Sequence, residues 1–113
     1  MFDTKIPAST TDTFDQDVRS AELVLVDFWA PWCAPCKASA PQLSKLAADN
    51  PHIKVLAVNV EENKDLAKDL FIRAVPTLQL YAKGIKVQEF IGAPAVMQAN
   101  AWLRTHHPVP PSE

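Results

Sequence analysis

Glycine, cysteine and long apolar runs are scarce in this chain, and each shortage excludes a class of protein. Of its 113 residues, only two are glycine and two are cysteine. Two cysteines are too few for a small secreted scaffold that several disulfides hold together. The longest apolar run, at 23–30, is far shorter than the roughly 20 residues needed to cross a bilayer. We therefore expect no membrane-spanning segment.

The chain also has no large excess of positive or negative charge. The formal net charge is −2, and no block of five like charges occurs. Nucleic-acid-binding domains concentrate basic residues on one face, so this class is disfavoured. Residues 1–22 contain no apolar core of the length that signal peptides carry. We therefore expect a cytoplasmic protein, in which a disulfide would be transient and chemical rather than structural.

The residues that are present suit one globular domain. Hydrophobic residues make up 48% of the chain and charged residues 21%, which are ordinary values for a domain of this length. Prolines are scattered until Pro108, Pro110 and Pro111, which cannot continue a helix. We expect a folded domain at residues 1–107 and a flexible, Pro-rich tail at 108–113.

Helical and strand patterns alternate along this domain. The predicted strands cover 23–29, 53–60, 77–81 and 86–91, and the predicted helices cover 11–18, 33–49, 63–70 and 94–107. Thr11 or Asp12 is the expected cap of the first helix, and Asn63 is the expected cap of the third. A near-continuous apolar strand indicates burial on both faces. The pattern therefore predicts a three-layer α/β domain with a mixed sheet, whose last two strands form a hairpin.

Both cysteines lie in one Cys-x-x-Cys motif, where the first predicted strand passes into a helix. They suit a zinc site, a buried structural pair or a redox dithiol. Zinc needs four ligands, and His52, His106 and His107 lack the spacing to supply the other two. Two structural cysteines would have no reason to stand together beside a proline and a tryptophan. The zinc and structural uses are therefore disfavoured.

A redox dithiol agrees with the chemistry of a helix start. Residues i and i+3 of a first helical turn are neighbours within reach of a disulfide. Unpaired amides and the positive end of the helix dipole favour the thiolate of Cys33, the attacking species. Lys37 adds positive charge nearby, and Pro35 suits a first turn. Cys36, one turn deeper, is then the thiol expected to resolve a mixed disulfide.

The segment Val26–Lys37, V-D-F-W-A-P-W-C-A-P-C-K, resembles the active-site segment of thioredoxins. Further similar residues follow in the same order, namely Pro41, Asn59, Ile72–Thr77, Gly84 and Gly92–Ala93. The match runs from about Thr11 to Leu103. The resemblance implies the thioredoxin fold, with a central mixed sheet of four or five strands flanked by helices.

The same resemblance implies a function. The chain is expected to reduce disulfides of protein substrates, with Cys33 as nucleophile and Cys36 as resolving thiol. No bound cofactor is expected in the domain, and the electrons would come from NADPH through thioredoxin reductase. The histidine spacing already disfavours a metal. We expect a monomer with no nucleic-acid or membrane partner.

Asp27 stands inside the apolar strand, where an unpaired carboxylate is costly. Hydrogen bonding to the backbone would give it a structural role. The resemblance instead favours a buried carboxyl with a raised pKa, which relays a proton to or from Cys36. Ala57 stands where many thioredoxins carry a lysine beside this carboxyl. We therefore expect a higher Asp27 pKa than in those relatives.

The resemblance also implies a substrate-contacting rim and a cis Val75–Pro76 peptide bond that faces the dithiol. The Val75 backbone would then be free to pair with an extended substrate segment. The expected rim residues around Cys33 are Trp32, Ala34, Pro35, Val75, Pro76, Gly92 and Ala93. Most thioredoxins carry Gly-Pro where this chain has Ala34-Pro35, a difference that bears on reduction potential and partner preference.

Two other functions stay open. The chain could be an oxidant or isomerase of disulfides, although the inner dipeptide lacks the histidine that such enzymes often carry. It could also be a thioredoxin-fold binding module, or a subunit of a larger assembly with incidental redox activity. Replacing both cysteines by serine distinguishes these classes, because a pure scaffold would survive the change.

Overall fold

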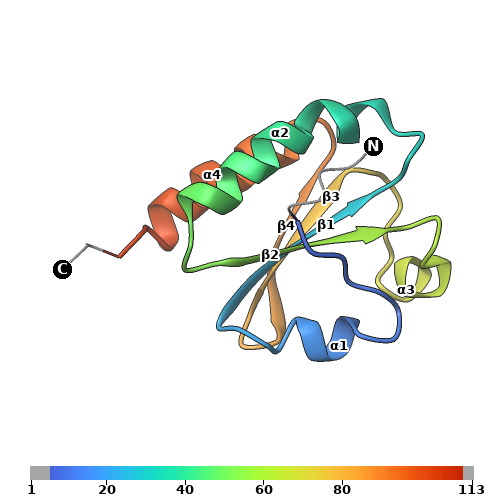
Figure 1. The fold of residues 1–113 in the computed structure, drawn as a ribbon, viewed down its shortest axis with the longest axis horizontal. Helices are drawn as coiled ribbons and strands as arrows, with labels where there is room; N and C mark the ends of the chain where they lie inside the picture. Colours follow the sequence, from blue (N-terminus) through green and yellow to red (C-terminus); the bar gives the residue numbers. More distant parts are fainter. Residues whose placement is uncertain (1–5, 111–113) are drawn as a thin grey trace.

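A computed structural model describes residues 6–110, which fold into one four-stranded sheet with helices on both faces (Figure 1). The elements are α1 (Phe14–Asp17), β1 (Leu23–Trp29), α2 (Ala34–Asp49), β2 (Lys54–Asn59), α3 (Lys64–Asp69), β3 (Thr77–Ala82), β4 (Ile85–Ile91) and α4 (Ala95–His106). The predicted three-layer α/β arrangement is confirmed.

The sheet is mixed, and its strand order is β2-β1-β3-β4. β1 pairs with β2 in parallel, and the pairs β1/β3 and β3/β4 are antiparallel. β1 is therefore central, which explains why its sequence is apolar almost throughout. Its first six residues are all buried. In this register Asp27 lies opposite Ala57 on one side and Leu78 on the other.

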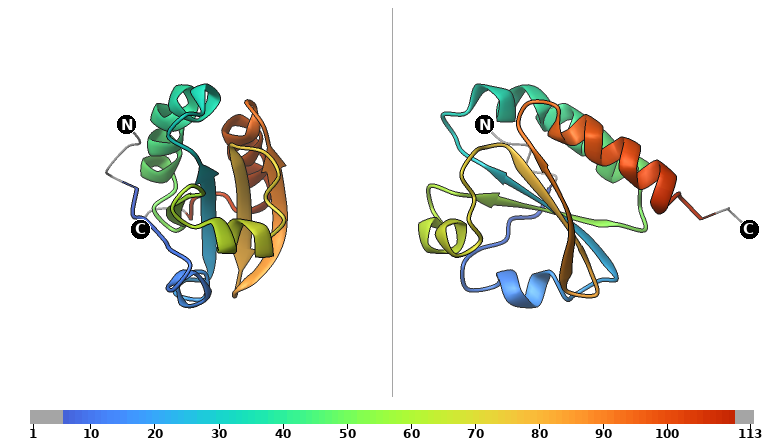
Figure 2. Two further views of the ribbon diagram at one scale, coloured as in Figure 1. Left: turned by 90° about the vertical axis from the view of Figure 1, so that its right-hand side faces the viewer. Right: turned by 180° about the vertical axis from the view of Figure 1, so that it is seen from behind.

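Each face of the sheet has its own hydrophobic core. α2 and α4 lie side by side on one face (Figure 2). There Leu43 and Leu103 belong to a buried cluster with alternate residues of the strands. α1 and α3 cover the other face, where Phe14 and Leu66 belong to the same buried cluster as Val26 of β1. Because successive strand residues point to opposite faces, β1 supplies both cores.

The hairpin between β3 and β4 agrees with the predicted turn. Lys83 and Gly84 form a two-residue loop with φ of 52° and 82°. Positive φ at both positions is the geometry that matches the twist of the flanking strands. A Cβ on Gly84 would come within 2.6 Å of Arg19 Cγ, so this position has a steric as well as a conformational need for glycine.

The predicted cap of the first helix is wrong. Thr13, not Thr11 or Asp12, is the N-cap of α1, and its side chain makes no capping hydrogen bond. Thr11 is occupied elsewhere, because its amide and hydroxyl donate to Asn63 Oδ1 at 2.9 and 3.2 Å. Asn63 is the N-cap residue of α3 as expected. Its side chain, however, accepts these hydrogen bonds from Thr11 and makes none to the helix that it begins.

The chain beyond α4 carries no regular secondary structure where it is described. Pro108 and Pro110 are exposed, while residues 111–113 lie outside the described residues. The flexible tail at 108–113, and with it the boundary of the domain at residue 107, stays a prediction.

Candidate functional site

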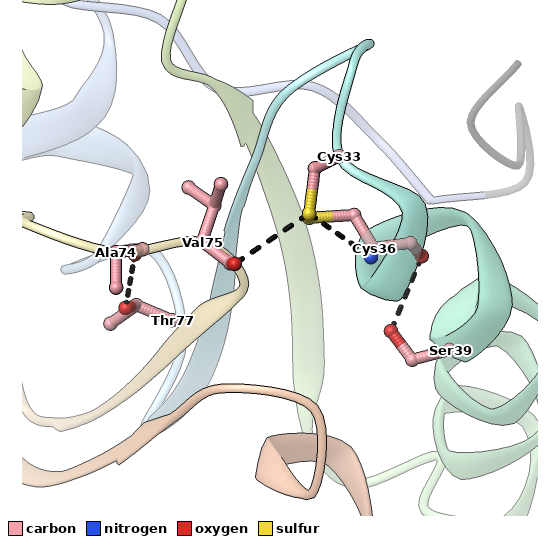
Figure 3. The surroundings of a disulfide bond; sticks show 6 residues. All are labelled: Cys33, Cys36, Ser39, Ala74, Val75 and Thr77. Carbon is pink, nitrogen blue, oxygen red and sulfur yellow. Dashed lines mark hydrogen bonds between the residues drawn. A yellow bond between two sulfur atoms is a disulfide. The ribbon is translucent and has the colours of Figure 1, made fainter.

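The two cysteines lie at the start of α2, after the short loop that follows β1. Cys33 is the N-cap residue of α2 with extended backbone, and Pro35 sits in the first turn. Cys33 and Cys36 form a disulfide, and their Cα atoms are 5.3 Å apart (Figure 3). The Cys33 sulfur also accepts a hydrogen bond from the Cys36 amide at 3.2 Å. The first turn of the helix thus points a backbone N–H at the sulfur.

Both cysteines are buried, with 3% of Cys33 and 1% of Cys36 exposed. They pack against Ala30 and the half-buried side chains of Trp29 and Val75. The difference in exposure between the two cysteines is small. Access to the disulfide therefore depends on the residues around it.

Val75 approaches the disulfide from the loop before β3. Its carbonyl oxygen is 3.6 Å from Cys33 Sγ (Figure 3). The expected cis Val75–Pro76 peptide bond is confirmed. The Thr77 hydroxyl donates to the Ala74 carbonyl at 2.7 Å and holds the loop against β3. The loop therefore presents a backbone carbonyl to the reactive sulfur.

Asp27 is the buried carboxyl that the sequence singles out. It is 3% exposed, and its Oδ1 has no hydrogen-bond partner. Burial away from water raises its pKa from 3.8 to about 7. By strand alternation it shares a face with Leu25, which packs in the core beneath α2 and α4. The Asp27 side chain therefore lies on the face of the sheet that α2, the helix that carries Cys36, covers.

The absence of a lysine at position 57 has a structural consequence for this carboxyl. Ala57 is the direct β2 partner of Asp27 and is itself buried. Side chains at paired positions lie on the same face of a sheet. No cation therefore opposes the effect of burial from that position. That the Asp27 pKa is higher than in relatives with a lysine there stays a prediction.

The expected rim residues lie around the start of α2, in the loop before β3 and in the loop after β4. Trp32 is 66% exposed, and Ala34, Pro35 and Ala93 are also exposed. The Gly92 amide donates to the Pro76 carbonyl at 2.8 Å, which joins the loop after β4 to the loop before β3. Pro76 itself is buried, so its neighbours carry the contact surface.

Lys37 is exposed on the first turns of α2. Its amide donates to the Cys33 carbonyl at 3.2 Å and continues the helix from its N-cap. The structure therefore keeps its ammonium in solvent near the helix start.

A groove of about 580 Å³ adjoins the disulfide on the side of α3. Trp32 and Val75 form its near end. Its other lining residues are Val60, Glu61, Lys64, Ala67, Lys68, Phe71, Ile72, Arg73 and Ala74. Sequence reasoning missed most of this surface, because only the tertiary fold brings α3 beside Trp32. The one local signal in the sequence is Phe71, an aromatic residue that directly follows the predicted helix 63–70.

The histidines lie away from this site. His52 Nε2 is 3.0 Å from the His107 carbonyl oxygen, and His106 stacks on Trp102 near the end of α4. Within residues 6–110, no three His, Cys, Asp or Glu side chains are grouped so as to hold a metal ion. No helix in that part of the chain is long and apolar enough to cross a membrane.

Comparison with known proteins gives one consistent result. The family model described as thioredoxin matches residues 5–105. Thioredoxin 1 of Synechococcus elongatus is 41% identical over 99 residues, which cover 84% of this chain and 92% of that protein. Thioredoxin 1 of Nostoc sp. is 40% identical over 99 residues, which cover 86% and 92%.

Solved structures agree with this result. Thioredoxin f2 of Chlamydomonas reinhardtii superposes with a TM-score of 0.86 at 32% sequence identity. The superposition covers 93% of this chain and 99% of that one. The similarity therefore includes the sheet, the helices on both faces and the segment that carries the disulfide.

Proposed function

This chain belongs to the thioredoxin family of thiol–disulfide oxidoreductases, and from that premise we propose that it reduces protein disulfides through Cys33 and Cys36, with Asp27 as proton relay. The observation that carries the proposal is the pairing of these two cysteines on the first turn of α2, beside the carbonyl of Val75.

The reaction proceeds by two thiol–disulfide exchanges. The Cys33 thiolate attacks one sulfur of a substrate disulfide, forms a mixed disulfide and expels the other substrate sulfur as a thiolate. The Cys36 thiolate then attacks Cys33 Sγ and releases the second substrate sulfur. The substrate gains two electrons and two protons, and the cysteine pair becomes a disulfide. Figure 3 thus corresponds to the oxidised state that follows turnover.

Cys33 is the nucleophile because the helix start favours its anion. The Cys36 amide 3.2 Å from its sulfur stabilises negative charge there. Lys37, one turn along and exposed, adds positive charge on the same side. In the reduced state the Val75 carbonyl 3.6 Å away is an acceptor for any remaining thiol proton.

Asp27 serves the second exchange. Cys36 is 1% exposed, so bulk water is a poor acceptor for its proton. A carboxyl with a pKa of about 7 and an unpartnered Oδ1 takes up and returns a proton near neutral pH. Its place on β1, on the face of the sheet that α2 covers, suits proton exchange with Cys36.

Substrates meet the disulfide through the exposed rim. Trp32 lies in the loop before α2, Ala34 and Pro35 begin that helix, and Gly92 and Ala93 come from the loop after β4. The Val75 backbone pairs with an extended substrate segment, and Pro76 holds that loop in place. Gly92 is held at the rim by its hydrogen bond to the Pro76 carbonyl.

The cycle closes when the disulfide is reduced again. We propose that electrons come from NADPH through thioredoxin reductase and that the chain acts as a monomer. The chain has two cysteines, and both belong to the reactive pair. This absence of structural disulfides suits a reducing compartment, and we propose the cytoplasm.

The test is capture of the mixed disulfide. The Cys36→Ser variant is reduced, mixed with a protein that contains accessible disulfides, such as insulin, and examined by mass spectrometry without reductant. We expect a covalent adduct at Cys33, which the Cys33→Ser variant does not form. The unmodified chain should reduce insulin catalytically with dithiothreitol as electron source. Binding without any adduct or turnover would instead favour a binding module.

A further inference from the structure

Phe71 stands at the end of α3 in a position that suits glycine. The Phe71 amide donates to the Lys68 carbonyl at 3.1 Å, and the Ile72 amide donates to the Ala67 carbonyl at 2.9 Å. These two bonds close the helix in a Schellman motif, which requires a left-handed residue immediately after the cap. Phe71 accordingly has φ of 58°, a disfavoured conformation for a bulky side chain.

Burial of the aromatic ring does not offset the strain of this backbone conformation. Phe71 is 75% exposed, so it contributes little to the core. A glycine would satisfy the helix end without strain and without exposing a ring to water. Strained and exposed residues of this kind concentrate at binding sites. The ring at this position therefore does not stabilise the fold, which points to a role in binding.

The groove supplies that explanation. Phe71 lines the groove of about 580 Å³ together with Trp32, a second exposed aromatic residue, which directly precedes Cys33. Val60, Ala67 and Ile72 make the lining between them apolar. The groove reaches Val75, whose carbonyl is 3.6 Å from Cys33 Sγ. A chain attached to Cys33 can therefore continue into the groove.

The edge of the groove is basic. Lys64 and Lys68 of α3 and Arg73 of the following loop line it, against a single carboxylate from Glu61. The chain as a whole carries a net charge of −2, so this balance is local. Within residues 6–110, none of the three cations takes part in an ion pair. They are therefore available to an acidic partner.

We propose that Phe71 is a specificity-determining residue, which selects substrate proteins whose reactive cysteine is flanked by an apolar or aromatic side chain and by Asp or Glu. The apolar side chain enters the groove between Phe71 and Trp32. The acidic residues meet Lys64, Lys68 and Arg73. This inference rests on the proposed disulfide reductase function, and it names the substrate class that the same site prefers.

The test compares peptide disulfides that differ only in these two features. Each peptide carries one cysteine in mixed disulfide with thionitrobenzoate, whose release reports attack by the reduced chain. One peptide contains Phe and Glu, one Phe and Gln, and one Ala and Glu; a thionitrobenzoate disulfide of free cysteine is the baseline. We expect the Phe–Glu peptide to react fastest, by about tenfold over the others, which corresponds to about 1.4 kcal/mol.

Phe71→Gly removes the ring while relieving the left-handed position, so loss of folding is not the expected result. It should lower the rate with the Phe–Glu peptide about tenfold and leave the free-cysteine disulfide unchanged. Phe71→Asn, which also tolerates this conformation, should behave in the same way. Lys83→Gly is the matched control, because Lys83 also has positive φ, at 52°, but lies in the β3–β4 turn outside the groove.

The charges are tested separately. The double variant Lys64→Gln, Lys68→Gln should slow the Phe–Glu peptide, spare the Phe–Gln peptide and weaken the dependence on salt. Lys83→Gln, an exposed lysine elsewhere, should change neither rate.

Three outcomes would overturn the inference. Equal rates for all peptides and the free-cysteine disulfide would remove the specificity but leave the reductase function intact. A chain that attacks no disulfide at all would remove both. Concentration-dependent dimerisation that Phe71→Gly abolishes, with no discrimination among peptides, would assign the groove to a second copy of the chain.

Discussion

Replacing Asp27 by Asn should remove a pH-dependent loss of stability. In the folded chain the pKa of Asp27 is raised from 3.8 to about 7 by burial. Each pKa unit corresponds to about 1.4 kcal/mol, so ionised Asp27 opposes folding by about 4 kcal/mol. Asparagine is close to aspartic acid in shape and never ionises, so it retains the buried polar group without the charge.

The sign follows from proton uptake. Between pH 4 and 7 the folded state holds a proton on Asp27 that the unfolded state has lost, so unfolding releases a proton and the free energy of unfolding falls as pH rises. Below pH 4 the carboxyl is protonated in both states, and the two chains should be equally stable in this respect. Above pH 7 the loss is complete, and Asp27→Asn should be more stable by up to about 4 kcal/mol.

The assay is urea unfolding of the oxidised chains from pH 4 to 9, followed by tryptophan fluorescence. The difference between the unmodified chain and Asp27→Asn cancels the contributions of other titrating groups. It should widen from pH 4 to 7 and stay constant above. A difference that does not change with pH would refute the reasoning, because it would mean that Asp27 titrates alike in the folded and unfolded states.

Three further predictions concern single positions. Ala57→Lys places an ammonium opposite Asp27 and should lower the Asp27 pKa by about 1 unit or more, measured by NMR titration of the carboxyl carbon. An unchanged pKa would contradict the pairing of positions 27 and 57 on one face of the sheet. Asp27→Asn should slow release of substrate from the Cys33 mixed disulfide at least tenfold near pH 7, in stopped-flow experiments in which the first attack stays unchanged; equal slowing of both steps would argue against a relay. Gly84→Ala should cost about 1–2 kcal/mol in urea unfolding, because φ is 82° and the new Cβ meets Arg19; Lys83→Gly in the same turn should cost nothing.

The fold was largely predictable because its signals are local. The apolar run at 23–29 indicates a central strand, and it lies between β2 and β3. The spacing of Cys33 and Cys36 places both on one helical turn, where they form the disulfide. Asp27 stands out as the one acidic residue in the apolar run at 23–29. It is indeed buried and without a partner at Oδ1.

What the sequence did not predict depends on contacts between distant residues. Thr11 is a good helix cap by type, yet Asn63, 52 residues away, takes its hydrogen bonds. Phe71 is apolar and follows the predicted helix 63–70, but it adopts a left-handed conformation at the helix end and is 75% exposed. The groove exists only because the fold brings α3 beside Trp32.

The reduction potential of the Cys33–Cys36 pair tests the central claim most directly. The oxidised and reduced chains are equilibrated in a series of dithiothreitol buffers, and the free thiols are counted by alkylation and mass spectrometry. A protein-disulfide reductase should titrate near the reducing end of the known range, about −270 mV for thioredoxin itself, a reference value for the family and not one worked from this structure. A potential near that of the strong oxidants, about −120 mV, would contradict the account.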